Sequence, residues 1–322
     1  MATDALVELD AEYRQLREEA GFVRRPSWRV IEIRGPDGVD LLESQLTNDI
    51  ASLAPGDGRY AALLDRKGHV QSDLRVLLLD PERAWLLAEA EGSNRIASHL
   101  AMYRIGRDVE VEFPELAAFS VIGPASAAAT GVDLPAVEHS HQPVVIGAVT
   151  DARAIATDVG IDLLAAAPSG SAIAAALEAA GVPEVGQDAA EIIRVETGRP
   201  RLGREMTTET MPAEAGIVDR AVSFGKGCYI GQETVARLHY RGKPNRHLRA
   251  LRLAAPARSG DSVRLDEREV GRLGTAVVSP AHGPIALAIL RREAEPGAAV
   301  VVGDAGVAAE VIDAQFAAPQ SG

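Results

Sequence analysis

One stretch of the chain reads Phe224-Gly225-Lys226-Gly227-Cys228-Tyr229-Ile230-Gly231-Gln232-Glu233, and it contains the only cysteine among 322 residues. Glycines on both sides allow positive φ and a close approach to a ligand. The residues after Gly231 can begin a helix, whose first backbone N–H groups would lie near the sulfur. A lysine and a helix N-terminus both favour thiolate, so Cys228 is a candidate reactive or ligand sulfur. A free cysteine is also often a small buried apolar side chain, and the stretch alone leaves both interpretations open.

The composition is that of a globular protein long enough for two or three domains. Hydrophobic residues make up 47% of the chain and charged residues 25%. No apolar run approaches the roughly 18 residues of a membrane helix, so no membrane partner is expected. The acidic first twenty residues argue against a secretory signal or transit peptide. A single cysteine cannot form an internal disulfide, which fits a reducing compartment. We therefore expect a cytoplasmic protein.

The charge is unevenly distributed along the chain. The net charge of −13 argues against non-specific binding of nucleic acid by the whole surface. Residues 220–252, however, contain eight lysines and arginines against one acid, which gives this segment a charge of +7. Such a run is often only a solvated face. Because this one flanks the cysteine stretch, it favours an anionic ligand or partner.

The pattern of helices and strands predicts an α+β fold. Strands are expected over residues 28–34, 60–64, 70–79 and 84–88, with helices over 39–46 and 94–103. From about 115 to 185, strands over 119–122, 144–150, 153–157 and 161–165 and helices over 125–130 and 171–180 are typical of a ferredoxin-like unit. After Pro244, short strands between glycine and proline turns predict a small β-barrel. We place the domain boundary so that residues 1–243 and 244–322 form separate regions.

The segment Lys226-Gly227-Cys228-Tyr229-Ile230-Gly231-Gln232-Glu233 resembles the signature of YgfZ-type folate-binding proteins, relatives of the glycine-cleavage T-protein (aminomethyltransferase). Other segments resemble the same superfamily in the same order: Gln45-Leu46-Thr47-Asn48-Asp49-Ile50, Gly68-His69-Val70-Gln71-Ser72-Asp73-Leu74, Arg194-Val195-Glu196-Thr197-Gly198-Arg199-Pro200 and residues 271–279.

The resemblance implies a GcvT-like ring of subdomains around a central hole that binds tetrahydrofolate or a one-carbon derivative. It also implies a role in assembly or repair of iron–sulfur enzymes, including radical enzymes that modify tRNA. The expected partners are therefore folate together with iron–sulfur enzymes or cluster-assembly proteins.

The resemblance also assigns cofactor-binding residues. In T-proteins a glutamate in the Arg-x-Glu-x-Gly string accepts hydrogen bonds from the pterin edge, and Glu196 holds that position. Asn48 and Tyr229 stand in matching motifs and are predicted to contact the cofactor. The folate tail is anionic, and four basic residues are candidates to meet it: Arg199, Arg220, Lys226 and Arg237.

Asp73 decides between two hypotheses of different class. Aminomethyltransferases have an Asp-Asp pair at this strand position, whereas this chain has Ser72-Asp73. The remaining carboxylate can still assist transfer chemistry, so Asp73 and Cys228 are the candidate catalytic residues. The leading hypothesis is a folate-binding maturation factor that uses Cys228. The alternative is a folate-dependent aminomethyltransferase that uses Asp73, and a folate store without chemistry is a third reading. Whether the chain is an enzyme stays open at this point.

No metal site is predicted from the histidines and the cysteine. Glu138-His139-Ser140-His141 contains ligand types, but a His-x-His pair in a polar loop before a proline is more often incidental. One cysteine cannot supply four thiolates to a conventional iron–sulfur cluster. A cluster shared with a second copy or with a partner stays open.

Overall fold

The computed structural model describes residues 2–316 of the chain. The chain divides into two compact units. Unit 1 comprises Met1–Leu64, Gln71–Ala190 and Arg220–Ile230, and unit 2 comprises Asp65–Val70, Glu191–Asp219 and Gly231–Gly322. The boundary predicted at residue 243 stays a prediction.

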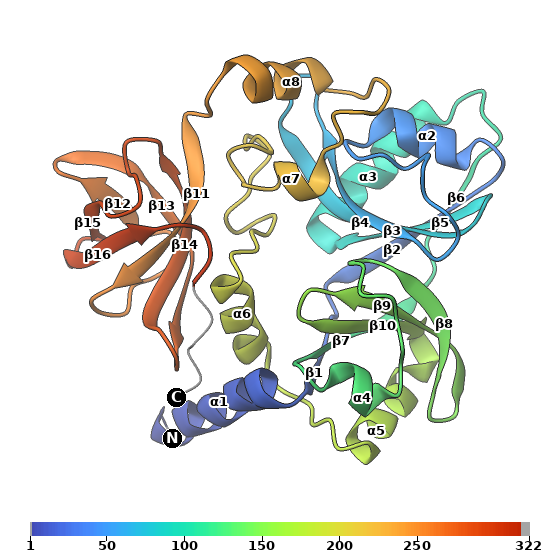
Figure 1. Ribbon diagram of the computed structural model, residues 1–322, viewed down its shortest axis with the longest axis horizontal. Helices are drawn as coiled ribbons and strands as arrows, with labels where there is room; N and C mark the ends of the chain where they lie inside the picture. Colours follow the sequence, from blue (N-terminus) through green and yellow to red (C-terminus); the bar gives the residue numbers. More distant parts are fainter. Residues whose placement is uncertain (1, 317–322) are drawn as a thin grey trace. The chain divides into compact units, whose positions relative to one another are not determined.

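The first sheet of unit 1 has the strand order β3-β4-β5-β2-β6. Its strands are β2 (Trp28–Arg34), β3 (Gly58–Leu64), β4 (Val70–Asp80), β5 (Arg83–Glu89) and β6 (Glu110–Glu112). Helices α2 (Gly38–Gln45) and α3 (Ala90–Tyr103) cover one face of this sheet (Figure 1). Apolar residues at helical spacing, among them Leu41, Leu42, Ile96 and Leu100, are buried in the core of this layer.

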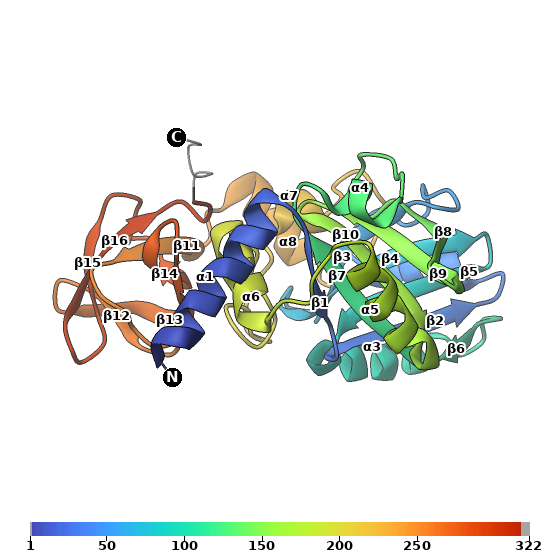
Figure 2. The ribbon, with the colours of Figure 1, turned by 90° about the horizontal axis from the view of Figure 1, so that it is seen from below.

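The second sheet of unit 1 is antiparallel, with the order β1-β7-β10-β9-β8. Its strands are β1 (Gly21–Arg24), β7 (Leu116–Ile122), β8 (His141–Ile146), β9 (Val149–Thr157) and β10 (Gly160–Ala166). Helices α4 (Ser126–Thr130) and α5 (Gly170–Ala179) lie along this sheet (Figure 2), and Ile173 and Leu177 of α5 are buried in its core. The remaining elements of this part of the chain are α1 (Ala2–Glu18), the short 3₁₀ helix η1 (Ala167–Ser169) and α7 (Val218–Ala221).

One predicted turn is misplaced by four residues. The sequence suggested strands over 144–150 and 153–157, but β8 and β9 are joined at Gly147 and Ala148, with Ile146 paired to Val149. Gly147 has a φ of 57°, which a two-residue hairpin turn requires and which glycine adopts without steric cost.

The inner faces of the two sheets pack against each other. Val30, Leu77 and Leu87 of the first sheet form one cluster with Ala118, Ile155 and Leu164 of the second. Along β2, Ile31 and Ile33 point instead into the helix-covered core, so alternate residues serve the two layers. Unit 1 is therefore a sheet-on-sheet core with helices on its outer faces.

Unit 2 contains a closed six-stranded barrel, as the sequence predicted. Its strand order is β11-β14-β13-β12-β15-β16. The strands are β11 (Arg246–Leu253), β12 (Ser262–Leu265), β13 (Arg268–Ser279), β14 (Gly283–Arg291), β15 (Ala299–Val302) and β16 (Val307–Ile312). Helix α6 (Gln187–Glu196) spans the junction of the two units in sequence, and α8 (Gln232–Arg241) precedes the barrel. Within residues 2–316, none of the helices combines the length and apolar character needed to cross a bilayer.

Candidate functional site

The residues predicted from the sequence fall into both units. Unit 1 contains Asn48, Asp73, Lys226, Cys228 and Tyr229, and unit 2 contains Glu196, Arg199 and Arg237.

Lys226 anchors the cysteine stretch to the end of α2. Its Nζ donates hydrogen bonds to the carbonyl oxygens of Glu43 (2.7 Å), Leu46 (2.9 Å) and Asn48 (2.7 Å). Its Nζ also lies 3.2 Å from the Glu43 carboxylate, and the side chain is 1% exposed. Carbonyls at a helix C-terminus lack intrahelical donors and attract cations. All three N–H donors of Lys226 are thus used inside the protein, so it is not available to an anionic ligand as placed.

Thr47 and Asn48 complete this connection. Thr47 Oγ1 donates to the carbonyl oxygen of Ala221 (2.5 Å) and accepts from the Ala62 backbone N–H (2.9 Å). Asn48 Nδ2 donates to the carbonyl oxygens of Tyr60 (2.8 Å) and Arg220 (2.9 Å). Asn48 was predicted to bind cofactor. Its side-chain donors connect the start of β3 to the segment that leads into the cysteine stretch, and a contact with the cofactor stays a prediction.

Cys228 is exposed at the surface of unit 1. Gly231 has a φ of 83° at the start of α8, as a glycine in this stretch was expected to allow. Gly225 and Gly227 do not have positive φ, and a Cβ at either position would meet no atom within 4 Å. The fold therefore does not require glycine there, and their effect is to leave the surroundings of the sulfur open.

Tyr229 is 7% exposed and carries a buried hydroxyl that has no hydrogen-bond partner among the described residues. Its ring lies 5.5 Å from Lys226 Nζ. Burial raises the pKa of Tyr229 to about 12, so the phenol keeps its proton at neutral pH. A buried hydroxyl without a partner costs about 1–3 kcal/mol. The hydroxyl is therefore an unsatisfied donor inside unit 1, and a contact between Tyr229 and the cofactor stays a prediction.

Asp73 lies on a polar face formed by β3 and β4. Its carboxylate accepts a hydrogen bond of 2.9 Å from the Tyr60 hydroxyl. The Arg220 guanidinium lies 5.1 Å from the centre of the Tyr60 ring and forms an ion pair with Glu138. The structure thus brings together Asp73, Tyr60 and Arg220, which are far apart in sequence. Arg220 was a candidate for the folate tail, but as placed it already has a carboxylate partner.

Ser72 faces the opposite side of β4 from Asp73. It is 1% exposed, and its Oγ donates to the Asp73 carbonyl oxygen at 3.0 Å. An aspartate at this position would place a carboxylate in the apolar core of the first sheet, where an unpaired charge is strongly disfavoured. The replacement of one acid by serine is therefore compatible with the packing of this chain.

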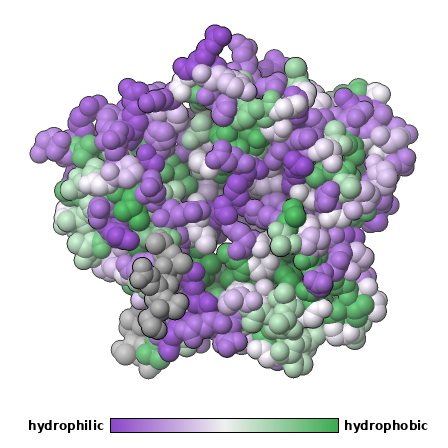
Figure 3. All heavy atoms as spheres, in the orientation of Figure 1, coloured by the Kyte–Doolittle hydropathy of each residue, from purple (hydrophilic) through white to green (hydrophobic). Residues whose placement is uncertain are grey.

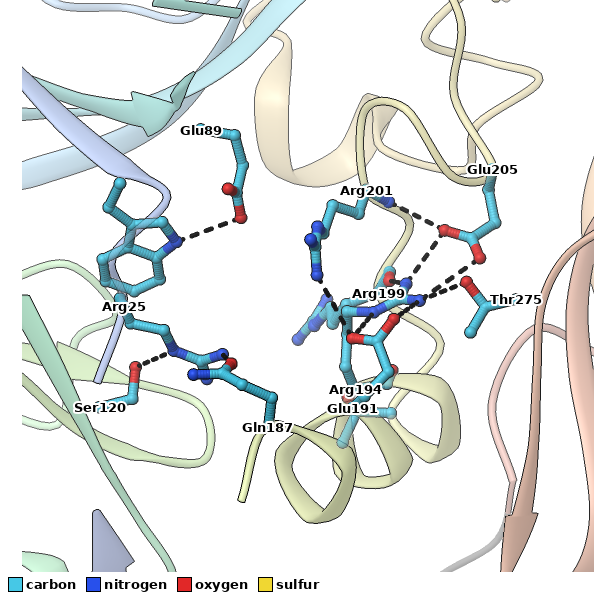
Figure 4. Close-up of polar contacts among 12 residues, drawn as sticks. Arg25, Glu89, Ser120, Gln187, Glu191, Arg194, Arg199, Arg201, Glu205 and Thr275 are labelled. Carbon is cyan, nitrogen blue, oxygen red and sulfur yellow. Dashed lines mark hydrogen bonds and ion pairs between the residues drawn. The ribbon is translucent and has the colours of Figure 1, made fainter. Parts of the chain in front are cut away.

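In unit 2, Arg194 of α6 lies at the centre of a buried network (Figure 4). Its guanidinium donates to the carboxylates of Glu191 and Glu205 and to Thr275 Oγ1, with the nearest approach to each between 2.7 and 3.0 Å. Burial alone would lower the pKa of Arg194, but hydrogen bonds and charges from the two glutamates raise it. This arginine therefore joins α6, the loop after it and the barrel strand β13.

Glu196 follows on the same helix and is 2% exposed. Its Oε1 accepts a hydrogen bond of 2.5 Å from Ser279 Oγ, and its carbonyl oxygen accepts from the Phe316 N–H at 3.0 Å. The carboxylate that the sequence assigned to the pterin therefore has a barrel hydroxyl as one partner. Its use as a pterin acceptor stays a prediction.

The other two predicted contacts of unit 2 differ in exposure. Arg199 is half-buried, and its carbonyl oxygen accepts a hydrogen bond of 2.5 Å from Arg194. Arg237 lies exposed on α8, where Val235 is the single buried residue. The upper edge of the view in Figure 3, over α8, is mostly hydrophilic. Arg237 thus faces solvent as part of the basic segment, and neither position tests a contact with folate.

Sequence reasoning missed a polar assembly on the inner face of the first sheet of unit 1. Trp28 of β2 is paired with Glu89 of β5, and Glu32 of β2 is paired with Trp85 of β5. In each pair the indole N–H donates to the glutamate, at 3.2 Å for Trp28 and 2.5 Å for Trp85. The sequence does contain a signal, because Trp-x-x-x-Glu occurs in both strands at 28–32 and 85–89.

The metal-ligand candidates near Glu138 are used in other ways. His141 is 3% exposed, and its Nε2 lies 3.1 Å from the Asp57 carbonyl oxygen. Arg153 donates to its Nδ1 at 2.7 Å. Since an arginine can only donate, His141 Nδ1 accepts and the proton lies on Nε2. His139 is also buried and lies 3.5 Å from the Glu138 carboxylate.

Comparisons with known proteins agree with this architecture. Residues 3–226 match the family described as the GCVT N-terminal domain. An aminomethyltransferase of Symbiobacterium thermophilum is 28% identical, over 95% of this chain and 88% of that protein. An uncharacterized protein of Haemophilus influenzae is 25% identical, over 70% of this chain and 71% of that protein.

A solved structure gives the same result for the fold. The glycine cleavage system aminomethyltransferase T from Bartonella henselae has a TM-score of 0.86 at 22% identity, covering 97% of this chain and 90% of that chain. The GcvT-like fold class predicted from the sequence is confirmed.

Proposed function

The chain belongs to the family of the GCVT N-terminal domain, and on that premise we propose that it binds tetrahydrofolate or a one-carbon derivative and assists the assembly or repair of iron–sulfur enzymes. The clients include, in this proposal, radical enzymes that modify tRNA. Cys228 is the group that meets the client or its cluster.

The observation that carries the proposal is the way in which Cys228 is presented. The sulfur-bearing residue is exposed, while Lys226, two residues earlier, is held by three carbonyls and a carboxylate. Gly225 and Gly227 leave open space beside it, although the backbone there does not need glycine. A rigidly anchored loop that exposes a thiol between two small residues suits contact with a second macromolecule.

Two residues support the folate part of the proposal. The buried Tyr229 hydroxyl can donate to a carbonyl, ring nitrogen or carboxylate of the cofactor, and it has no competing partner among the described residues. Glu196, whose Oε1 accepts from Ser279 Oγ, supplies a carboxylate of the kind that accepts hydrogen bonds from pterin N–H groups. When bound, the folate would supply a one-carbon unit or its acceptor, and this chain's residues would hold and orient it.

A second candidate is an aminomethyltransferase, and one contact favours it. Asp73 is held by the Tyr60 hydroxyl, so a single carboxylate is positioned on the polar face of β4. Several relatives of this chain are named aminomethyltransferases. A positioned carboxylate is what proton transfer at a reacting group requires.

The test expresses the Cys228→Ala and Asp73→Asn variants in cells from which the gene for this chain has been deleted. Restored activity of iron–sulfur enzymes and tRNA thiomethylation are measured for each variant and for the wild type. We expect Asp73→Asn to restore both and Cys228→Ala to restore neither. In parallel, the purified protein is mixed with tetrahydrofolate and an aminomethyl-lipoyl carrier. Turnover near 1 s⁻¹ that is lost in Asp73→Asn would establish the transferase instead. Full restoration by Cys228→Ala would show that Cys228 does not carry the maturation role. Unchanged iron–sulfur enzyme activity and tRNA thiomethylation in the cells that lack the chain would remove that role altogether.

A further inference from the structure

The two Trp–Glu pairs of β2 and β5 are related by the antiparallel ladder between these strands. Trp28 lies opposite Glu89, Val30 opposite Leu87, and Glu32 opposite Trp85. An apolar pair is therefore flanked on each side by a Trp–Glu pair of the same chemistry. Residues on the inner face of a strand recur every second position, which places both indoles on the face that packs against the second sheet.

Each indole also has an arginine above its ring. The Arg75 guanidinium of β4 lies 4.7 Å from the centre of the Trp28 ring, and that of Arg153 from β9 lies 5.6 Å from the Trp85 ring. Both distances are within the range of a cation–π contact. Each end of the ladder thus combines a tryptophan, a glutamate and an arginine over the indole ring. The two ends differ in the second partner of that arginine.

At the Trp28 end the charges are balanced. Arg75 forms an ion pair of 2.5 Å with Asp162 of β10, whose side chain is 6% exposed. Asp162 also accepts from Ser120 Oγ at 2.6 Å, and Ser120 accepts from Arg25 at 2.9 Å. Figure 4 shows the contacts of Arg25 with Ser120 and Gln187. Two arginines, Arg25 and Arg75, are accompanied here by the carboxylates of Asp162 and Glu89.

At the Trp85 end one cation has no carboxylate. Glu32 accepts from Arg83 through both oxygens, at 2.9 and 3.2 Å, and it is also paired with Arg34. Arg153 donates instead to the neutral ring of His141, and within the part of the chain that the structure describes it has no ion pair. Burial lowers the pKa of Arg153, and the charge of Arg83 lowers it further. Arginine stays protonated nonetheless, so a half-buried positive charge is left uncompensated.

We propose that Arg153, with Arg83 beside it and Trp85 beneath it, forms a binding site for an oxyanion, a phosphate or carboxylate group of a ligand. The guanidinium has five N–H donors, of which one is used on His141, and its planar fork suits a bidentate oxyanion. Arg83 is 40% exposed, so the site opens to solvent. A cation that is withdrawn from water without a counter-charge is disfavoured, and an oxyanion would supply the missing negative charge. The proposal does not depend on the function proposed above.

The two tryptophans make the site directly measurable, because they are the only ones in the chain. In Trp28→Phe the fluorescence reports on Trp85 alone, and in Trp85→Phe it reports on Trp28 alone. Each protein is titrated with sodium phosphate and, separately, with sodium succinate, against sodium chloride of equal ionic strength. We expect a saturable change in the Trp85 signal with a Kd in the millimolar range and no saturable change in the Trp28 signal.

Adding Arg153→Met to the Trp28→Phe protein should weaken this binding at least tenfold, which corresponds to about 1.4 kcal/mol. Arg153→Lys, which keeps the charge without the planar fork, should weaken it less. Circular dichroism establishes that each variant is folded. Saturation by phosphate and not succinate identifies a phosphate ligand, and the reverse identifies a carboxylate. A Trp85 signal that follows sodium chloride for both salts would overturn the proposal, as would unchanged binding in folded Arg153→Met.

Discussion

The two ends of the β2–β5 ladder in unit 1 carry the same residue types, a tryptophan, a glutamate and an arginine, but the charge of the arginine is compensated at one end only. Trp28 and Trp85 each donate to a glutamate on the opposite strand, and each is covered by an arginine. Arg75 then meets a buried carboxylate, whereas Arg153 meets a neutral histidine. The residue of the second sheet that each arginine meets, Asp162 or His141, thus separates a self-contained ion pair from a cation that can take a ligand. The same Trp–Glu–Arg arrangement therefore stabilises the fold at the Trp28 end and leaves an arginine able to bind an anion at the Trp85 end.

The largest expected effect is at the balanced end. Arg75→Met leaves Asp162 buried without its cation, and removing one partner of a buried pair costs about 3–5 kcal/mol. Urea unfolding of the purified variant measures the loss. Replacing both partners in Arg75→Met/Asp162→Asn removes the stranded charge and should recover most of it. A single variant as stable as the wild type would show that this end is not held by its ion pair.

At the Trp85 end of the ladder, we expect the unfolding free energy to decrease at acid pH because of His141. Burial, with a further contribution from Arg153, lowers the pKa of His141 from 6.5 to about 4. Between these values the unfolded chain binds more protons than the folded one, so stability falls as the pH is lowered from about 6.5 to 4. At about 1.4 kcal/mol per pKa unit, His141 accounts for about 2–3 kcal/mol of this loss at pH 4.

His141→Gln is the matched control for the pH effect. Its amide can accept from Arg153 and donate to the Asp57 carbonyl oxygen without titrating. The difference in unfolding free energy between wild type and His141→Gln should therefore change with pH between 6.5 and 4, in favour of the variant in acid. Parallel pH profiles for the two proteins would show that His141 is not held neutral by its surroundings.

The smallest effect is expected for Arg153→Met. The substitution loses a cation–π contact worth about 0.5–1 kcal/mol and one hydrogen bond to His141, but it also removes a half-buried charge without a carboxylate. We expect a change in unfolding free energy within about 1 kcal/mol, well below that of Arg75→Met. Added phosphate should raise the melting temperature of the wild type and not of Arg153→Met. Equal losses in the two arginine variants would contradict the comparison.

Much of the fold could be predicted from local patterns. The strands over 28–34, 60–64, 70–79 and 84–88 agree with β2 to β5 within two residues, because alternation and turn residues are properties of neighbouring positions. The barrel after Pro244 follows from short strands at regular spacing. The turn at Gly147 was misplaced because Gly147 and the polar residues Thr150 and Asp151 all suit a reversal, and only strand pairing selects among them.

The candidate site was less predictable, because its roles depend on partners that are distant in sequence. From the sequence, Lys226 was interpreted as a cation beside a thiol. In the structure its ammonium group donates hydrogen bonds to three backbone carbonyl oxygens between residues 43 and 48. Asn48 reads as a ligand contact, yet its amide joins two backbone segments. Tyr229 was predicted to contact the cofactor from its motif, and only the structure shows that its hydroxyl is buried without a hydrogen-bond partner among residues 2–316.

The sequence by itself determined the periodicities, the turn residues, the single cysteine between glycines and the motifs of the family, since each of these is carried by adjacent positions. The tertiary structure decided which charges are compensated. Arg75 and Arg153 both occupy inner-face positions of strands, and no local rule distinguishes them. Only the packing of the second sheet places Asp162 against one and His141 against the other, and the energy of a buried charge depends on that neighbour.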